Sequence, residues 1–111
     1  MNTFDLEEAS RRLANLPQGL LEHCQRTSQL CREMARRFGE PEDRAAWAGL
    51  VHDLARSLSV EELLRLAREY AIPVNEVEAQ VPLLLHGPVG AEILCREWKI
   101  TDREVLEAVA C

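Results

Sequence analysis

The sequence of 111 residues lacks several features that mark broad functional classes. No apolar run approaches the roughly 20 residues of a membrane-spanning helix. The polar, acidic start at residues 1–5 does not resemble a secretory signal peptide. Positive charge is also scarce, because 13 Lys and Arg residues stand against 19 Asp and Glu residues, for a net charge of −6. The sequence therefore predicts a cytoplasmic protein that neither coats nucleic acid nor lies on an anionic membrane.

Cysteine is present but follows no metal or redox pattern. None of the four cysteines, at positions 24, 31, 95 and 111, forms the C-x-x-C spacing of zinc and redox sites. Cys24 and Cys31 would lie on one helix face, about 10 Å apart along the axis, which is too far for a disulfide. We therefore expect both to be small core residues of a cytosolic protein.

Strand and hairpin signals are missing, whereas apolar residues recur with helical spacing along almost the whole chain. Proline, glycine and two capping boxes, Ser59–Glu62 and Thr101–Glu104, set the expected boundaries. The sequence predicts an all-α fold, and its length suits a single domain over residues 1–111 with a modest core. The expected helices cover about residues 4–15, 19–38, 41–57, 59–71 and 73–79, then a helix that ends near 98 after the apolar entry 82–88, and a last helix from 101.

One carboxylate lies where the pattern is otherwise apolar. His52 and Asp53 occur in the segment 45–55, which is apolar on nearly all sides and should be buried. A buried carboxylate is costly unless its charge is compensated, and a divalent metal ion beside an imidazole compensates it. The other two histidines, His23 and His86, lie on flanking segments. We therefore expect all four side chains to share one metal site.

Each of these residues also has an ordinary structural interpretation. His23 alone would be a core histidine bonded to a backbone carbonyl, and His86 alone would cap a helix. Asp53 alone would pair with Arg56 at a helix end, where the helix dipole disfavours a carboxylate. Their coincidence in one small bundle favours the metal interpretation, and imidazole with carboxylate suits Fe, Mn, Zn, Co or Ni. Arg56 is then either a solvated surface residue or a contact for a phosphate bound at the ion.

Three segments resemble the HD-domain metal-dependent phosphohydrolases and, among them, the YqeK family. They are residues 21–24, 48–56 and 84–91, and the His-Gly-Pro-Val-Gly-Ala sequence of the last is the most specific. The resemblance covers residues 18–111 and implies a compact HD-domain helical bundle. It also implies a bacterial enzyme that cleaves diadenosine tetraphosphate symmetrically into ADP. The implied cofactor is iron in a dinuclear site, with Mn, Co or Zn as alternatives.

The resemblance also implies roles for single residues. His23, His52, Asp53 and His86 match the metal ligands of the family. Asp53 would in addition accept a proton from the attacking water, and Arg56, where the family often has Lys, would bind substrate phosphate. Family members continue with a His-Thr-Thr-Gly-Arg-like segment and a further Asp ligand. We therefore expect a C-terminally truncated chain with low activity, and exposed apolar surface that favours a homodimer.

Two other functions stay open on the residues alone. One is a different HD enzyme, either a nucleoside monophosphate phosphatase or a cyclic-nucleotide phosphodiesterase. The other is an inactive truncated HD module whose histidines hold a structural metal or none. A panel of nucleotide substrates separates the first from the dinucleotide hydrolase, and the metal content of the purified protein identifies the second.

Overall fold

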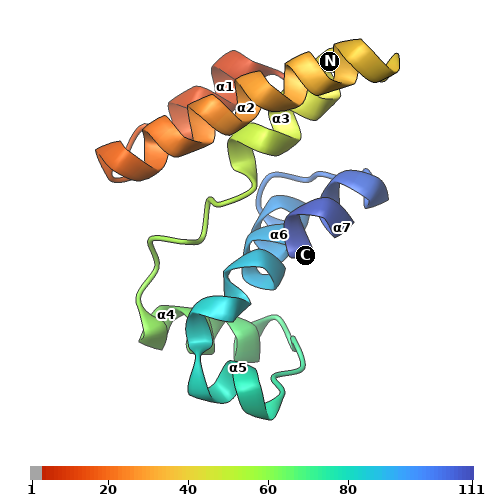
Figure 1. Ribbon diagram of the computed structural model, residues 1–111. Coiled ribbons are helices and arrows are strands. Elements are labelled where there is room, and N and C mark those ends of the chain that lie inside the picture. The colour runs from red at the N-terminus through yellow and green to blue at the C-terminus, as the bar shows by residue number, and fades with distance from the viewer. Residues whose placement is uncertain (1–3) are drawn as a thin grey trace. The chain divides into compact units, whose positions relative to one another are not determined.

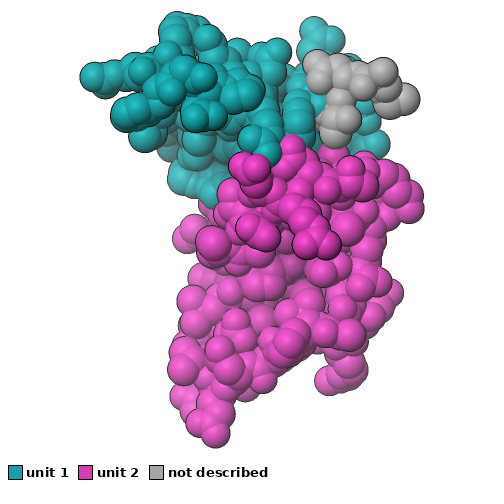
Figure 2. Space-filling model, turned by 90° about the vertical axis from the view of Figure 1, so that its right-hand side faces the viewer, with its two compact units in different colours: residues 1–52 teal, residues 53–111 magenta. Residues whose placement is uncertain are grey.

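The computed structural model describes residues 4–111, and in that range the secondary structure is helical without strands, as the sequence predicts. None of the helices in this range has both the length and the apolar character that crossing a membrane demands. Two compact units divide the chain: unit 1 ends at His52 and unit 2 begins at Asp53 (Figure 2). Figure 1 labels the helices, which are α1 (Leu6–Arg12), α2 (Gln18–Phe38), α3 (Glu42–Val51), α4 (Val60–Glu69), α5 (Glu76–Gln80), the 3₁₀ helix η1 (Pro82–Leu85), α6 (His86–Arg96) and α7 (Arg103–Ala110).

Unit 1 is built on α3, against which both α1 and α2 pack. A helix with neighbours on two sides is expected to be apolar over most of its surface, and α3 is. Cys24 is buried and Cys31 is half-buried, both as thiols, which confirms that they do not form a disulfide. The buried residues of the three helices are Ala9, Cys24, Ala35, Ala46, Trp47, Gly49, Leu50 and Val51.

The contact between α2 and α3 is close because Gly49 has no side chain. A Cβ atom at this position would lie 2.9 Å from the Sγ of Cys31 and 3.0 Å from the carbonyl oxygen of Thr27. One turn away, the hydroxyl of Ser28 donates a hydrogen bond of 2.7 Å to the carbonyl oxygen of Ala46. The backbones of the two helices are therefore held together by a glycine contact and a side-chain hydrogen bond.

α3 ends at Val51, not near residue 57, so the prediction that His52 and Asp53 lie inside this helix is wrong. The Nδ1 of His52 lies 2.6 Å from the Gly49 carbonyl oxygen, which a continuing helix would offer to the N–H of Asp53. The chain beyond forms turns, the first closed by a 2.9 Å bond from the Arg56 N–H to the Asp53 carbonyl. The His52 side chain thus competes with the backbone for the Gly49 carbonyl at the end of α3.

Unit 2 has its own core, to which α4, η1 and α6 contribute. α7 packs against α6 at Gly87, where a Cβ atom would lie 2.8 Å from the carbonyl oxygen of Ala110. The core cluster consists of Ala55, Leu63, Ala67, Leu85 and Val89, with six half-buried residues around it: Leu54, Leu58, Leu64, Leu66, Ile72 and Ile93.

Capping boxes begin two helices of unit 2. The predicted box at Ser59 is confirmed, because its hydroxyl accepts the N–H of Glu62 and the Glu62 carboxylate accepts the N–H of Ser59, both at 3.1 Å. A second box, which was not predicted from the sequence, joins Asn75 and Glu78 and begins α5. Each box satisfies N–H groups that have no partner within the helix.

Two aspartates begin helices at positions other than those expected. Asp102 accepts the N–H of Val105 at 3.1 Å and is the N-cap of α7, so the predicted Thr101–Glu104 box is wrong. Asp is at least as good an N-cap as Thr, and here it takes that place one residue later. Asp5 likewise accepts the N–H groups of Glu7 and Glu8, and α1 begins after it and not at residue 4.

Candidate metal centre

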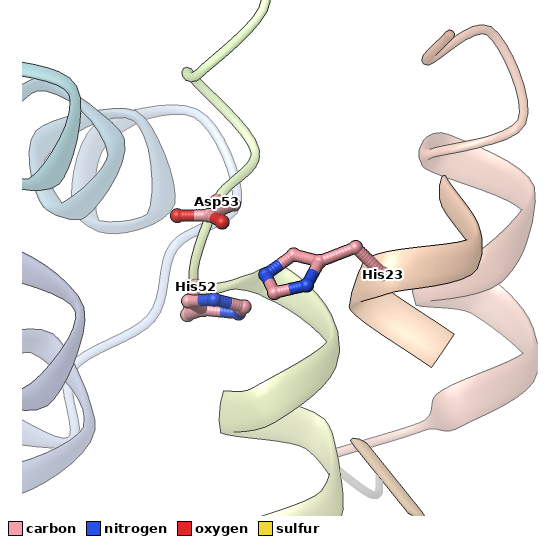
Figure 3. A group of neighbouring side chains, drawn as sticks. All are labelled: His23, His52 and Asp53. Carbon is pink, nitrogen blue, oxygen red and sulfur yellow. The ribbon is translucent and has the colours of Figure 1, made fainter. Parts of the chain in front are cut away.

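Two histidines of unit 1 come together where α2 packs against α3. His23 projects from α2, and His52 follows the last residue of α3 (Figure 3). Their ring centroids are 5.3 Å apart, with the ring planes inclined at 56°. Both residues are half-buried. The close approach of the two helices at Gly49, three residues before His52, accounts for the short distance between the rings.

Backbone carbonyls determine which nitrogen of two histidines is available to a ligand. The Nδ1 of His52 lies 2.6 Å from the Gly49 carbonyl oxygen, and the Nδ1 of His86 lies 2.7 Å from that of Leu83. A carbonyl oxygen only accepts hydrogen bonds, so each Nδ1 carries the proton that it donates. In the neutral ring this leaves a lone pair on Nε2, the arrangement that metal-binding histidines use.

Asp53 is the only charged residue between positions 4 and 111 that is buried, with 4% of its surface exposed. Within unit 2 its Oδ1 lies 3.2 Å from the Nε2 of His86, and its Oδ2 lies 3.8 Å from the Nη1 of Arg56. A lone pair on Nε2 would repel the carboxylate oxygen. A proton or a cation shared by these two atoms makes the contact with His86 favourable.

The peptide bond between His52 and Asp53 links the two histidines of unit 1 to this carboxylate. One possible ligand atom each from His23, His52 and Asp53 lies within 4.8 Å of the other two (Figure 3). His86 is not part of this group of three and contacts it through Asp53. Two imidazoles and a carboxylate form a donor set that fits Fe, Mn, Zn or Co.

Two neighbouring side chains complete the description of the site. The Arg56 side chain is 52% exposed, so its guanidinium is accessible to a phosphate while one nitrogen stays near Asp53. Cys31 lies against Gly49, and burial raises the pKa of its thiol. Cys31 is not part of the group of possible ligand atoms that His23, His52 and Asp53 form.

The polar residues of the site can be recognised in the sequence, but the residues that position them were not among those predicted. Gly49 both permits the helix contact and supplies the carbonyl that orients His52. The available signal was an isolated glycine inside an apolar helix, which costs stability and usually has a packing reason. The carbonyl of Leu83, which orients His86, has no signature in the residue types.

Residues 20–111 match the family model of the HD domain. The chain is 32% identical over 77 residues to a symmetrical bis(5'-nucleosyl)-tetraphosphatase of Bacillus subtilis (strain 168). The aligned part covers 69% of this chain and 41% of that protein. It is 29% identical over 104 residues to the enzyme of the same name from Staphylococcus aureus (strain NCTC 8325 / PS 47), with 92% and 53% covered. The chain thus spans about half the length of these curated relatives.

A solved structure from Clostridium acetobutylicum has the same fold. It is described as a predicted HD superfamily hydrolase involved in NAD metabolism. The match has a TM-score of 0.88 at 24% identity and covers 96% of this chain and 57% of that one. The all-α fold predicted from the sequence is therefore shared with a solved structure.

Proposed function

Because this chain belongs to the HD-domain family, we propose that it is a metal-dependent hydrolase that cleaves diadenosine tetraphosphate symmetrically into ADP. Membership of the family supports a hydrolase, and the two curated relatives carry the name of the symmetrical tetraphosphatase. The observation that carries the proposal is the buried carboxylate of Asp53, which lies beside histidine nitrogens that can bind the same cation. We further propose that residues 1–111 act as a single HD domain in the bacterial cytoplasm.

The proposed metal ligands are His23, His52, Asp53 and His86. The Nε2 atoms of His52 and His86 are suited to this role because the opposite ring nitrogens donate to carbonyls. The resemblance to the YqeK family implies iron, and Mn, Co or Zn fit the same donors. When bound, such an ion activates a water molecule and offsets the negative charge of phosphate oxygens.

The chain's own residues then position the substrate and accept the proton. Asp53 is a carboxylate in contact with both a histidine and an arginine, and it would take the proton that the attacking water loses. The accessible guanidinium of Arg56 would donate charge-assisted hydrogen bonds to a substrate phosphate. The carbonyl bonds of the two histidines would hold the ligand geometry while the substrate binds.

Replacement of Asp53 by Asn tests this proposal. The change keeps the shape of the side chain but removes the charge, so metal-induced stabilisation should disappear and ADP release should fall by at least about tenfold. Without metal the variant should be as stable as the parent or more so, because a buried carboxylate is lost. Thermal melts with and without Mn²⁺, and chromatography of the nucleotide products, measure both effects.

Asp43→Asn is the matched control, since Asp43 is an aspartate in the first turn of α3 that is exposed and pairs with Arg32 at 2.9 Å. This variant should keep both the metal-induced stabilisation and the ADP release of the parent. An equal metal-induced shift in the parent and in Asp53→Asn would exclude Asp53 as a ligand. ATP and AMP as products would contradict symmetrical cleavage, and hydrolysis of nucleoside monophosphates alone would contradict the dinucleotide substrate.

A further inference from the structure

An exposed apolar face on α2 takes no part in the candidate metal centre. Leu30, Met34 and Phe38 are 56%, 50% and 73% exposed. They follow one another at intervals of four residues and so lie on the same side of the helix. We call these three residues the α2 face. It belongs to unit 1.

Unit 2 carries a second apolar face, which we call the α5–η1 face. α5 and η1 pack against each other, and the exposed residues lie on them or directly beside them. Exposed apolar patches that are rimmed by polar residues mark interaction sites. The residues of the face are 41–61% exposed: Val74, Val77, Val81, Leu83 and Leu84.

The two faces have rims of opposite charge. Exposed Arg26 and Arg37 border the α2 face on the same helix, with Glu33 between them. Exposed Glu76 borders the α5–η1 face, and the half-buried Glu78 lies two residues further along α5. From residue 69 to residue 95 the sequence contains no Lys or Arg at all. A basic rim around one apolar face thus matches an acidic rim around the other.

We propose that the α2 face of one copy of this chain binds the α5–η1 face of a second copy. A second copy is the occupant that the charges favour, because pairing of the α5–η1 face with itself would bring acidic rims together. The contact joins two different surfaces. If it forms twice between the same two copies, the result is a two-fold dimer, and otherwise the contact is heterologous and extends into longer assemblies.

Two substitutions that each introduce a negative charge distinguish this contact from a contact of either face with itself. Met34→Glu disables the α2 face and Val77→Glu disables the α5–η1 face, while each leaves the other face intact. Val60→Glu is the matched control, since Val60 is 49% exposed and belongs to neither face. Analytical ultracentrifugation in the presence of a chelator measures the mass, so the result does not depend on the metal centre.

The parent chain and Val60→Glu should show masses above the 12.6 kDa monomer that rise with concentration. Met34→Glu and Val77→Glu should each be monomeric alone, and an equal mixture of the two should form a complex of twice the monomer mass. Only a contact between the two different faces gives this complementation. Phe38→Glu and Leu84→Glu repeat the test at independent positions, after circular dichroism has confirmed that each variant is folded.

Three results would overturn the proposal. A parent chain that is monomeric at every concentration shows that the faces do not bind each other. Association that survives Val77→Glu but not Met34→Glu, or the reverse, shows that one face pairs with itself. A mixture of the two variants that stays monomeric shows that the surfaces are not complementary.

Discussion

At Gly49 a single hydrogen atom in place of a side chain determines how closely α2 and α3 approach. Its Cα faces the backbone of α2 at Thr27 and the side chain of Cys31, and its carbonyl oxygen holds the ring of His52. Since His23 lies on α2 and His52 follows α3, the separation of the two helices also sets the distance between the two rings. One packing residue therefore controls part of the candidate ligand geometry.

Gly49→Ala should destabilise the protein by about 1–3 kcal/mol, because the added methyl group meets backbone atoms that cannot move independently. The Cβ would lie 3.0 Å from the Thr27 carbonyl oxygen and 3.1 Å from the Cα of Ser28. Urea denaturation measures the change. Gly19→Ala is the control, since no atom lies within 4 Å of its Cβ position, and it should gain about 0.5–1 kcal/mol from helix propensity. Equal stability of the two variants would show that the helix contact tolerates a methyl group.

The polar residues of the site could be predicted from the sequence, but the distances between them could not. A carboxylate in an apolar segment is visible in the sequence, because burial of charge is costly whatever the fold. The contacts of Asp53 with His86 and Arg56 involve turns and a short 3₁₀ segment, whose geometry residue periodicity does not determine. The roles of these residues as ligands and catalytic groups stay predictions.

At the scale of the helices, local chemistry decided which boundaries could be predicted. The Ser59 box was predictable because its two hydrogen bonds depend only on residues three apart. The end of α3 was not predictable, because the apolar pattern continues past it. The helix ends where the His52 side chain takes the Gly49 carbonyl as its hydrogen-bond acceptor. Side chains that bond to their own backbone carry no signal in hydrophobic periodicity.

The capping box at the start of α4 should give stability a dependence on pH. Hydrogen bonds from Ser59 lower the pKa of Glu62 below its ordinary value of 4.5. A carboxylate with a lowered folded-state pKa stabilises the protein above its unfolded-state pKa, and this contribution is lost as pH falls through the folded-state pKa. The stability difference between the parent and Glu62→Gln should therefore be constant near neutral pH and shrink in acid.

Chemical denaturation at a series of pH values measures this difference. Glu61→Gln is the control, because Glu61 is exposed in the same first turn but is not part of the box. Its stability difference from the parent should change less with pH. If the stability differences of the two variants changed equally with pH, the capping box would not contribute to the pH dependence of stability.

At the scale of the whole molecule, net charge governs how copies of the chain meet. The charge of −6 at neutral pH falls towards zero near the isoelectric point of about 5.1. Repulsion between copies should therefore weaken as pH falls towards that value, and association should increase. Light scattering at constant ionic strength measures this effect. Scattering that decreases between neutral pH and the isoelectric point would contradict it.

Composition and periodicity predicted the all-α architecture because nearly every helix has an apolar stripe that must be buried. They did not predict a boundary between compact units at His52 and Asp53, since no proline, glycine or polar run marks that position. The boundary instead falls inside the largely apolar segment 45–55. That the residues on both sides act as a single domain stays a prediction.

The different exposure of the cysteines allows local opening of the native protein to be measured through their reaction with a thiol reagent. Cys95 and Cys111 of unit 2 are exposed, so a thiol reagent should modify them at the rate of a small-molecule thiol. Cys24 is fully buried on α2, and a reagent reaches it only while that part of unit 1 is transiently open. The slow phase of modification therefore measures how often unit 1 opens in the native state, without an engineered cysteine or a denaturant.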